Sequence, residues 1–141
     1  MMRPLLVALL AAILCGACGD DAPTAPSTTA PTRYTEMIAG TLAVGGAQFY
    51  SFTVGTSGAT DVTLLSLRPA GVPTTTLGTT IGVGLGTPAG TDCALKNAIT
   101  TAPALVKQIS VTTEPSIYCV KIADVGGLSG TVDYNVRVIH P

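Results

Sequence analysis

Few residues of this chain are suited to catalysis, and they do not cluster in the sequence. His140, the only histidine, is the penultimate residue, and we expect it to lie at a mobile chain end. Apart from Asp20 and Asp21, no two carboxylates of the chain are adjacent, and no acidic loop suits calcium. Catalysis needs a base that titrates near neutral pH, an activated nucleophile or a bound metal, and these residues provide none of the three in an evident cluster. We therefore expect no catalytic residue, no metal and no cofactor, and the chain is predicted not to be an enzyme.

Two of the four cysteines, Cys93 and Cys119, lie 26 positions apart in the part of the chain that is expected to fold. This separation matches no zinc-ligand spacing, and there is no second histidine to complete a metal site. In an oxidising compartment the pair predicts a disulfide. Closing a loop of this length contributes about 3–4 kcal/mol in the chain-entropy account. A metal site and a catalytic thiol are the alternatives.

The first twenty residues read MMRPLLVALLAAILCGACGD. One arginine precedes an apolar run that is too short to span a bilayer and ends in small residues before Cys18, which is typical of an export signal. The segment resembles bacterial lipoprotein signals, which implies removal of residues 1–17 and lipid attachment at Cys18. The position three before that cysteine, where the family carries a branched aliphatic residue, is Cys15 here. An ordinary secreted protein cut near Ala17, or an uncleaved anchor, are the alternatives.

Residues 18–33 hold the lipidated cysteine and a linker rich in Pro, Thr and Ala, which lacks the apolar residues needed to fold. We expect an exported protein, held by its lipid at a membrane in the periplasm or at the cell surface. The chain has seven basic and eight acidic residues and no basic cluster. This balance argues against nucleic acid as a partner.

From 34 to 141 the pattern becomes short runs with a period of two, separated by Gly, Pro and Asp. We predict an all-β domain, an antiparallel β-sandwich of seven or eight strands resembling a jelly roll. The expected core consists of the in-phase apolar positions: Leu42, Tyr50, Phe52, Val54, Ile81, Val83, Leu85, Ile109, Val111, Tyr118, Val120, Ile122, Val132, Tyr134, Val136 and Val138.

Some segments are harder to interpret. The run 61–67 is apolar on both faces, so its inward side cannot be assigned. Glycines alternate with apolar residues from Gly82 to Gly86, which indicates a bulge or the close approach of another backbone. We expect a strand over 105–111, a single helical turn within 92–102, and a disulfide that holds a loop at 86–104 against the outside of a sheet.

The strand residues 40–42, 49–54, 61–64, 115–122 and 134–138 together resemble the bacterial pre-peptidase C-terminal domain over about residues 36–139. The resemblance implies a small β-sandwich that is appended to secreted hydrolases or occurs alone in envelope proteins. The chain departs from the family at Ala47, where an Asp often precedes the aromatic strand, and at Ser116, where the family has a turn glycine.

The resulting prediction is an envelope protein that presents a non-catalytic sandwich for protein interaction or structural support. The alternatives are an accessory domain of a secreted hydrolase and a weak carbohydrate-binding module. Phe49 and Tyr34 are the aromatic residues that remain for surface contact. His140, Asp61 and Asp124 are expected to be replaceable without effect on the fold, because His140 is expected at a mobile chain end and Asp commonly bonds to its own loop backbone.

Overall fold

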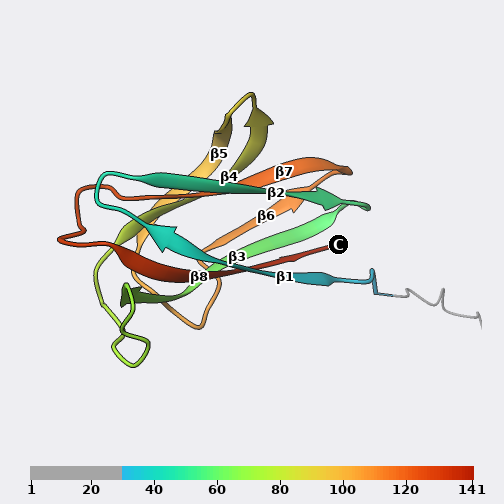
Figure 1. Cartoon of the computed structure of the whole chain (residues 1–141). Coiled ribbons are helices and arrows are strands. Elements are labelled where there is room, and N and C mark those ends of the chain that lie inside the picture. Colours follow the sequence, from blue (N-terminus) through green and yellow to red (C-terminus); the bar gives the residue numbers. More distant parts are fainter. Residues whose placement is uncertain (1–29) are drawn as a thin grey trace, which may run out of the picture.

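The computed structural model describes residues 30–141, which fold into eight strands. The strands are β1 (Tyr34–Leu42), β2 (Ala47–Val54), β3 (Gly58–Pro69), β4 (Ile81–Ala89), β5 (Asp92–Thr101), β6 (Ile109–Thr113), β7 (Ser116–Ala123) and β8 (Val132–His140). Two four-stranded sheets have the orders β1-β8-β3-β6 and β2-β7-β4-β5, and every pairing is antiparallel. The two sheets face each other as a jelly-roll sandwich, as predicted (Figure 1). None of the described residues belongs to a helix that could span a membrane.

The core lies between the two sheets, where alternate residues of the strands point inward. Every residue expected there is either buried in it or packs against it, with Tyr50, Val111 and Tyr118 only partly buried. The core also contains Ile38 of β1 and Leu128 of the loop before β8, neither of which was expected.

Strand β3 explains why its inward face could not be assigned from the sequence. A register shift in its pairing with β8 falls between Leu64 and Ser66. Before the shift Val62 and Leu64 are buried, and after it Leu67 is buried. A bulge moves the inward phase by one residue, so the apolar pattern changes face within one strand.

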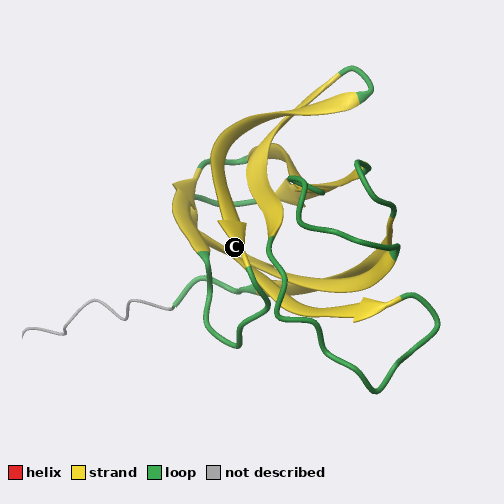
Figure 2. Ribbon diagram, turned by 90° about the vertical axis from the view of Figure 1, so that its left-hand side faces the viewer, coloured by secondary structure: helices red, strands yellow, loops and turns green. Residues whose placement is uncertain are grey.

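Three predicted segments are wrong. The segment expected to contain a helical turn forms β5, whose pairing with β4 extends from Asp92 to Thr101. The strand expected over 105–111 begins only at Ile109, and Leu105 and Val106 are 86% and 72% exposed. The loop expected at 86–104 is mostly the β4–β5 hairpin, which curls above the rest of the sandwich (Figure 2).

The chain enters and leaves the sandwich at the same end, because Tyr34 of β1 pairs with His140 of β8. Arg33, assigned by sequence to the linker, donates hydrogen bonds to the carbonyls of Ala59 and Ile139 and to the carboxylate of Asp61. The chain is therefore fixed to the sandwich one residue before β1. The signal segment 1–17 and Cys18 lie outside the described residues.

Candidate binding face

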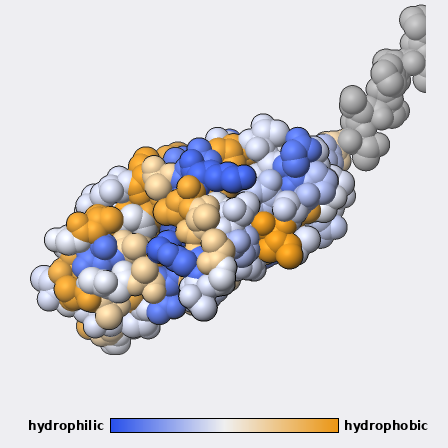
Figure 3. All heavy atoms as spheres, turned by 90° about the horizontal axis from the view of Figure 1, so that it is seen from above, coloured by the Kyte–Doolittle hydropathy of each residue, from blue (hydrophilic) through white to orange (hydrophobic). Residues whose placement is uncertain are grey.

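The outer face of the β2-β7-β4-β5 sheet carries small side chains over most of its area. Its register places Phe49, Lys121, Gly84 and Ala98 side by side, one from each strand. The flanking rows consist of Ala47, Ala123, Gly82 and Thr100 on one side and Ser51, Cys119, Gly86 and Leu95 on the other. With so little side-chain volume, this face is hollowed at two places. Hydrophilic and hydrophobic patches alternate across the surface that Figure 3 shows.

The beginning of β5 folds onto this face at Gly86. A Cβ at Gly86 would overlap the carbonyl oxygen of Ala94, so only glycine allows the two backbones to approach this closely. The β4–β5 register shifts between Leu85 and Gly86, as expected for a glycine-containing bulge. The start of β5 is thereby brought toward β7, across the strand that separates them.

The predicted disulfide between Cys93 and Cys119 is confirmed, with a Cα–Cα distance of 5.9 Å. It joins β5 to β7 within one sheet, on the outer side, and does not cross the core. Both cysteines are buried, at 4% and 0% exposure. The bond fixes the first residues of β5 in place, and Asp92 is the residue directly before it.

Asp92 forms an ion pair with Lys121, whose Nζ lies 2.8 Å and 3.0 Å from the two carboxylate oxygens. The hydrogen bonds from Lys121 and from the backbone N–H of Cys93 lower the pKa of Asp92. The carboxylate is therefore charged at neutral pH and is oriented by donors on two sides. The side chain of Asp92 is 60% exposed and that of Lys121 23%.

Phe49 lies beside this ion pair in an open hollow of about 450 Å³, lined also by Gln48 and Thr91. The aromatic ring comes from β2, the ammonium group from β7 and the carboxylate from β5. An aromatic surface and a small set of oriented polar groups are what a small-molecule site requires. Sequence analysis identified Phe49 but missed Asp92 and Lys121, because only the fold of β5 brings them together.

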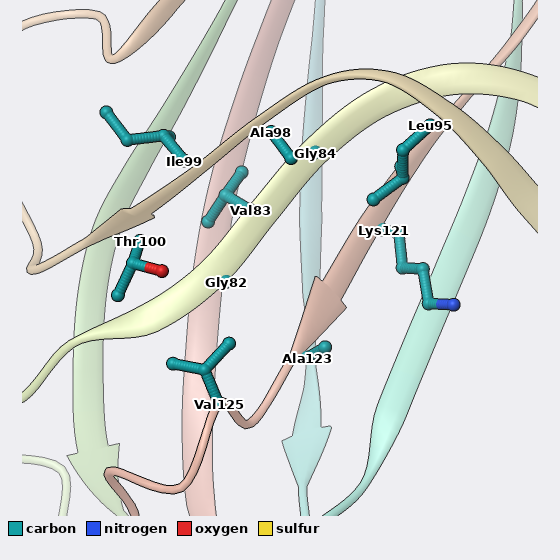
Figure 4. Close-up of a pocket in the computed structure, with 10 residues that line it drawn as sticks. All are labelled: Gly82, Val83, Gly84, Leu95, Ala98, Ile99, Thr100, Lys121, Ala123 and Val125. Carbon is teal, nitrogen blue, oxygen red and sulfur yellow. The ribbon is translucent and has the colours of Figure 1, made fainter.

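A second hollow, of about 250 Å³, lies on the other side of Lys121 (Figure 4). Gly82 and Gly84 form its floor, and Leu95 and Val125 form its walls. The terminal carbons of Leu95 occupy the space above Gly84, where a Cβ would lie 2.7 Å from them. The second hollow is apolar, and Lys121 separates it from the hollow at Phe49.

The two aromatic residues expected to contact a partner do not form one platform. Tyr34 stacks on His140, with ring centroids 5.9 Å apart, at the end where the chain enters. Thr53 of β2 lies beside Tyr34 and His140 at this end of the sandwich. Phe49 precedes Thr53 by four residues in the same strand, a distance of about 13 Å. Only Phe49 belongs to the hollowed face.

The prediction that His140 is mobile is wrong. It ends β8 with its side chain 4% exposed, and its ring lies 5.0 Å from that of Phe52. Nε2 lies 3.2 Å from a carboxylate oxygen of Glu36, and Nδ1 lies 3.1 Å from the backbone oxygen of Pro141. Both ring nitrogens are engaged, so the histidine belongs to the packing of the sandwich.

Asp124 caps its own loop, as expected, but Asp61 and Asp124 also bond to segments distant in sequence, which argues against their being replaceable. Asp61 has a 10% exposed side chain and accepts hydrogen bonds from Arg33, Lys107 and Ser110. One oxygen of Asp124 accepts from the backbone of Gly45, 79 positions away. Its other oxygen accepts three backbone N–H groups of the loop that follows, those of residues 126, 127 and 128. Each carboxylate therefore joins segments that are distant in sequence.

No family model matches the chain, and no curated protein matches it. Among solved structures, the crystal structure of the Yersinia pseudotuberculosis-derived mitogen matches with 13% sequence identity and a TM-score of 0.49. The match covers 78% of this chain and 88% of that one. A likeness this distant supports no argument about function.

Proposed function

We propose that the protein is an envelope lipoprotein whose sandwich is a non-catalytic interaction module, and that its binding face is the outer face of the β2-β7-β4-β5 sheet. The observation that carries this proposal is the hollow at Phe49, where Asp92 and Lys121 are held in place by the disulfide and by each other. Exposed polar groups that are already oriented bind a partner at a lower cost in conformational entropy.

The remaining polar residues support a binding role over catalysis. His140 is buried with both ring nitrogens engaged, and each of the carboxylates of Asp61 and Asp124 accepts at least three structural hydrogen bonds. Within residues 30–141 no three His, Cys, Asp or Glu side chains are grouped so as to hold a metal ion. A general base needs a free lone pair within reach of a substrate, and most lone pairs of these three residues are engaged in structural hydrogen bonds.

The membrane part of the proposal rests on the sequence of residues 1–18, in which an apolar run and Gly16-Ala17 precede Cys18. The linker that follows would hold the sandwich away from the bilayer. The resemblance to the pre-peptidase C-terminal domain adds a second candidate, an accessory domain that assists a secreted hydrolase.

The anchor is tested with Cys18→Ser in the full chain, followed by fractionation of the cells. The wild-type chain should sediment with membranes, start at Cys18 and carry lipid by mass spectrometry. The variant should become soluble. A variant that stays in the membrane fraction and keeps residues 1–17 contradicts a lipid anchor and indicates an uncleaved one.

The binding face is tested in intact cells by site-specific photocrosslinking. A photoreactive amino acid in place of Ser51, which is exposed on the hollowed face, should give a discrete adduct. The same group in place of Met37, 57% exposed on the opposite sheet, should not. Equal labelling from both positions contradicts a specific face. An adduct with a hydrolase at position 51 supports the accessory role.

A further inference from the structure

We propose, on the basis of the binding face assigned above, that the hollow at Phe49 binds a neutral pyranose unit of a polysaccharide. The apolar face of the sugar ring would pack on Phe49, and its hydroxyl groups would bond to Asp92 and Lys121. These three residues line one hollow and come from three strands.

The hydrogen-bonding capacity of the ion pair fits adjacent hydroxyl groups. The ammonium group of Lys121 donates to both carboxylate oxygens of Asp92. An ammonium group has three N–H donors, so one donor is free for a ligand. The carboxylate has about four acceptor sites, of which Lys121 and the Cys93 N–H occupy only part. A hydroxyl group can donate to Asp92 while its neighbour accepts from Lys121. Gln48 and Thr91 add an amide and a hydroxyl at the rim.

The charge of the hollow favours a neutral ligand. The positive charge of Lys121 is paired at 2.8 Å with the negative charge of Asp92, which leaves the site without net charge. The carboxylate of an acidic sugar that accepted from Lys121 would lie beside the negative charge of Asp92, and this repulsion opposes its binding. A neutral sugar can use both members of the pair without separating them.

The shape of the face gives a longer chain room to continue. From Phe49 the central row passes Lys121 and Gly84 to Ala98, three strand spacings and about 14 Å. The second hollow lies along this row, with glycine at its floor. A peptide that adds as a strand is disfavoured at the β5 edge, since the exposed Lys96 lies at the bulge there.

The test measures binding of the full chain, extracted from membranes in detergent, by isothermal titration calorimetry. The probes are laminarin, dextran and mannan as neutral polysaccharides and polygalacturonate as an acidic one. At least one neutral probe should bind. Phe49→Ala should weaken that binding about tenfold or more, since it removes the aromatic surface, whereas Phe49→Tyr should retain it. The matched control is Tyr34→Ala, which removes the exposed aromatic side chain outside the hollow and should bind like wild type.

Asp92→Asn provides an independent readout, because it leaves Lys121 without its carboxylate. Neutral binding should weaken, and binding of polygalacturonate should appear or increase. Thermal melting verifies that each variant is folded. The inference is overturned if no neutral probe binds, if Phe49→Ala binds unchanged, or if the wild type prefers the acidic probe. If no sugar binds but Phe49→Ala abolishes a protein adduct at position 51, this inference fails while the proposed interaction function stands.

Discussion

The hydroxyl groups of Tyr50 and Tyr134 lie 2.9 Å apart and form a partly buried hydrogen bond. Tyr50 belongs to β2 and Tyr134 to β8, so this hydrogen bond joins the two sheets. Gly40 of β1 makes room for it, since a Cβ there would lie 2.5 Å from the Tyr134 oxygen. Burial and the bond from Tyr50 raise the pKa of Tyr134 well above its usual range. The phenol of Tyr134 therefore remains neutral at physiological pH.

Tyr50→Phe should destabilise the fold by about 1–3 kcal/mol, because it leaves the buried hydroxyl of Tyr134 without its partner. Chemical denaturation gives the free energy of unfolding. Tyr34→Phe is the matched control, since Tyr34 is 58% exposed and its loss of a hydroxyl should cost almost nothing. Equal stability of the two variants would contradict an inter-sheet role for the bond.

Gly86→Ala should destabilise the domain by about 1–3 kcal/mol, since the added methyl group overlaps the backbone of Ala94. The hollow at Phe49 should be lost with it, because β5 can no longer cross onto the outer face. Gly78→Ala is the control, as a Cβ at Gly78 meets no atom within 4 Å. Thermal melts compare the variants; a Gly86→Ala protein as stable as the control would refute this packing.

Reduction of the disulfide should lower the stability of the domain by about 3–4 kcal/mol, the value expected for a loop closed over 26 residues. Thiol titration of the unreduced, denatured chain should find no reactive sulfhydryl at Cys93 or Cys119. Denaturation with and without reductant measures the difference. Two titratable thiols at these positions would show that the bond is absent in the isolated protein.

The stability of the fold should fall in acid through Asp61. Burial acts to raise the pKa of Asp61, but the hydrogen bonds from Ser110, Lys107 and Arg33 outweigh it, so the pKa lies below its usual 3.8. A lowered folded-state pKa means that the stabilisation is present above about pH 4 and is lost as the pH falls through the folded value.

Asp61→Asn should therefore be less stable than wild type at neutral pH, by about 1–3 kcal/mol, and should lose less stability on acidification. Urea denaturation between neutral and acidic pH measures both effects. A variant whose pH dependence matches the wild type would show that other carboxylates carry the acid sensitivity.

The strands that alternate regularly could be predicted from the sequence, because their inward residues follow a period of two without interruption. Strand β8 is the clearest, with Val132, Tyr134, Val136 and Val138 all buried. β5 could not be predicted, since apart from Cys93 it is largely exposed on both faces and lacks an inward apolar row. The inward face of β3 could not be predicted either, because the extra residue of its bulge moves the buried positions to the other face of the strand.

The candidate site was only partly visible in the sequence. The disulfide follows from counting cysteines, and Phe49 follows from its outward phase in β2. Asp92 and Lys121 are 29 positions apart, and no local pattern connects them. The same limit applies to Asp61, whose partners Arg33, Lys107 and Ser110 come from separate segments. The role of a single charged residue can be assigned only when the fold shows which distant residues lie beside it.

The hydrogen bonds of Arg33 to β3 and β8 affect which strands would carry a mechanical load applied to the linker. A pull on the chain ahead of Arg33 reaches Asp61 of β3 and the carbonyl of Ile139 in β8 before it reaches β1. β3 and β8 are interior strands, each paired on both sides, whereas β1 is an edge strand paired only with β8. An edge strand pulled from its end can peel away one bond after another. The bonds of Arg33 would therefore share a load applied at the linker between β1 and the two interior strands.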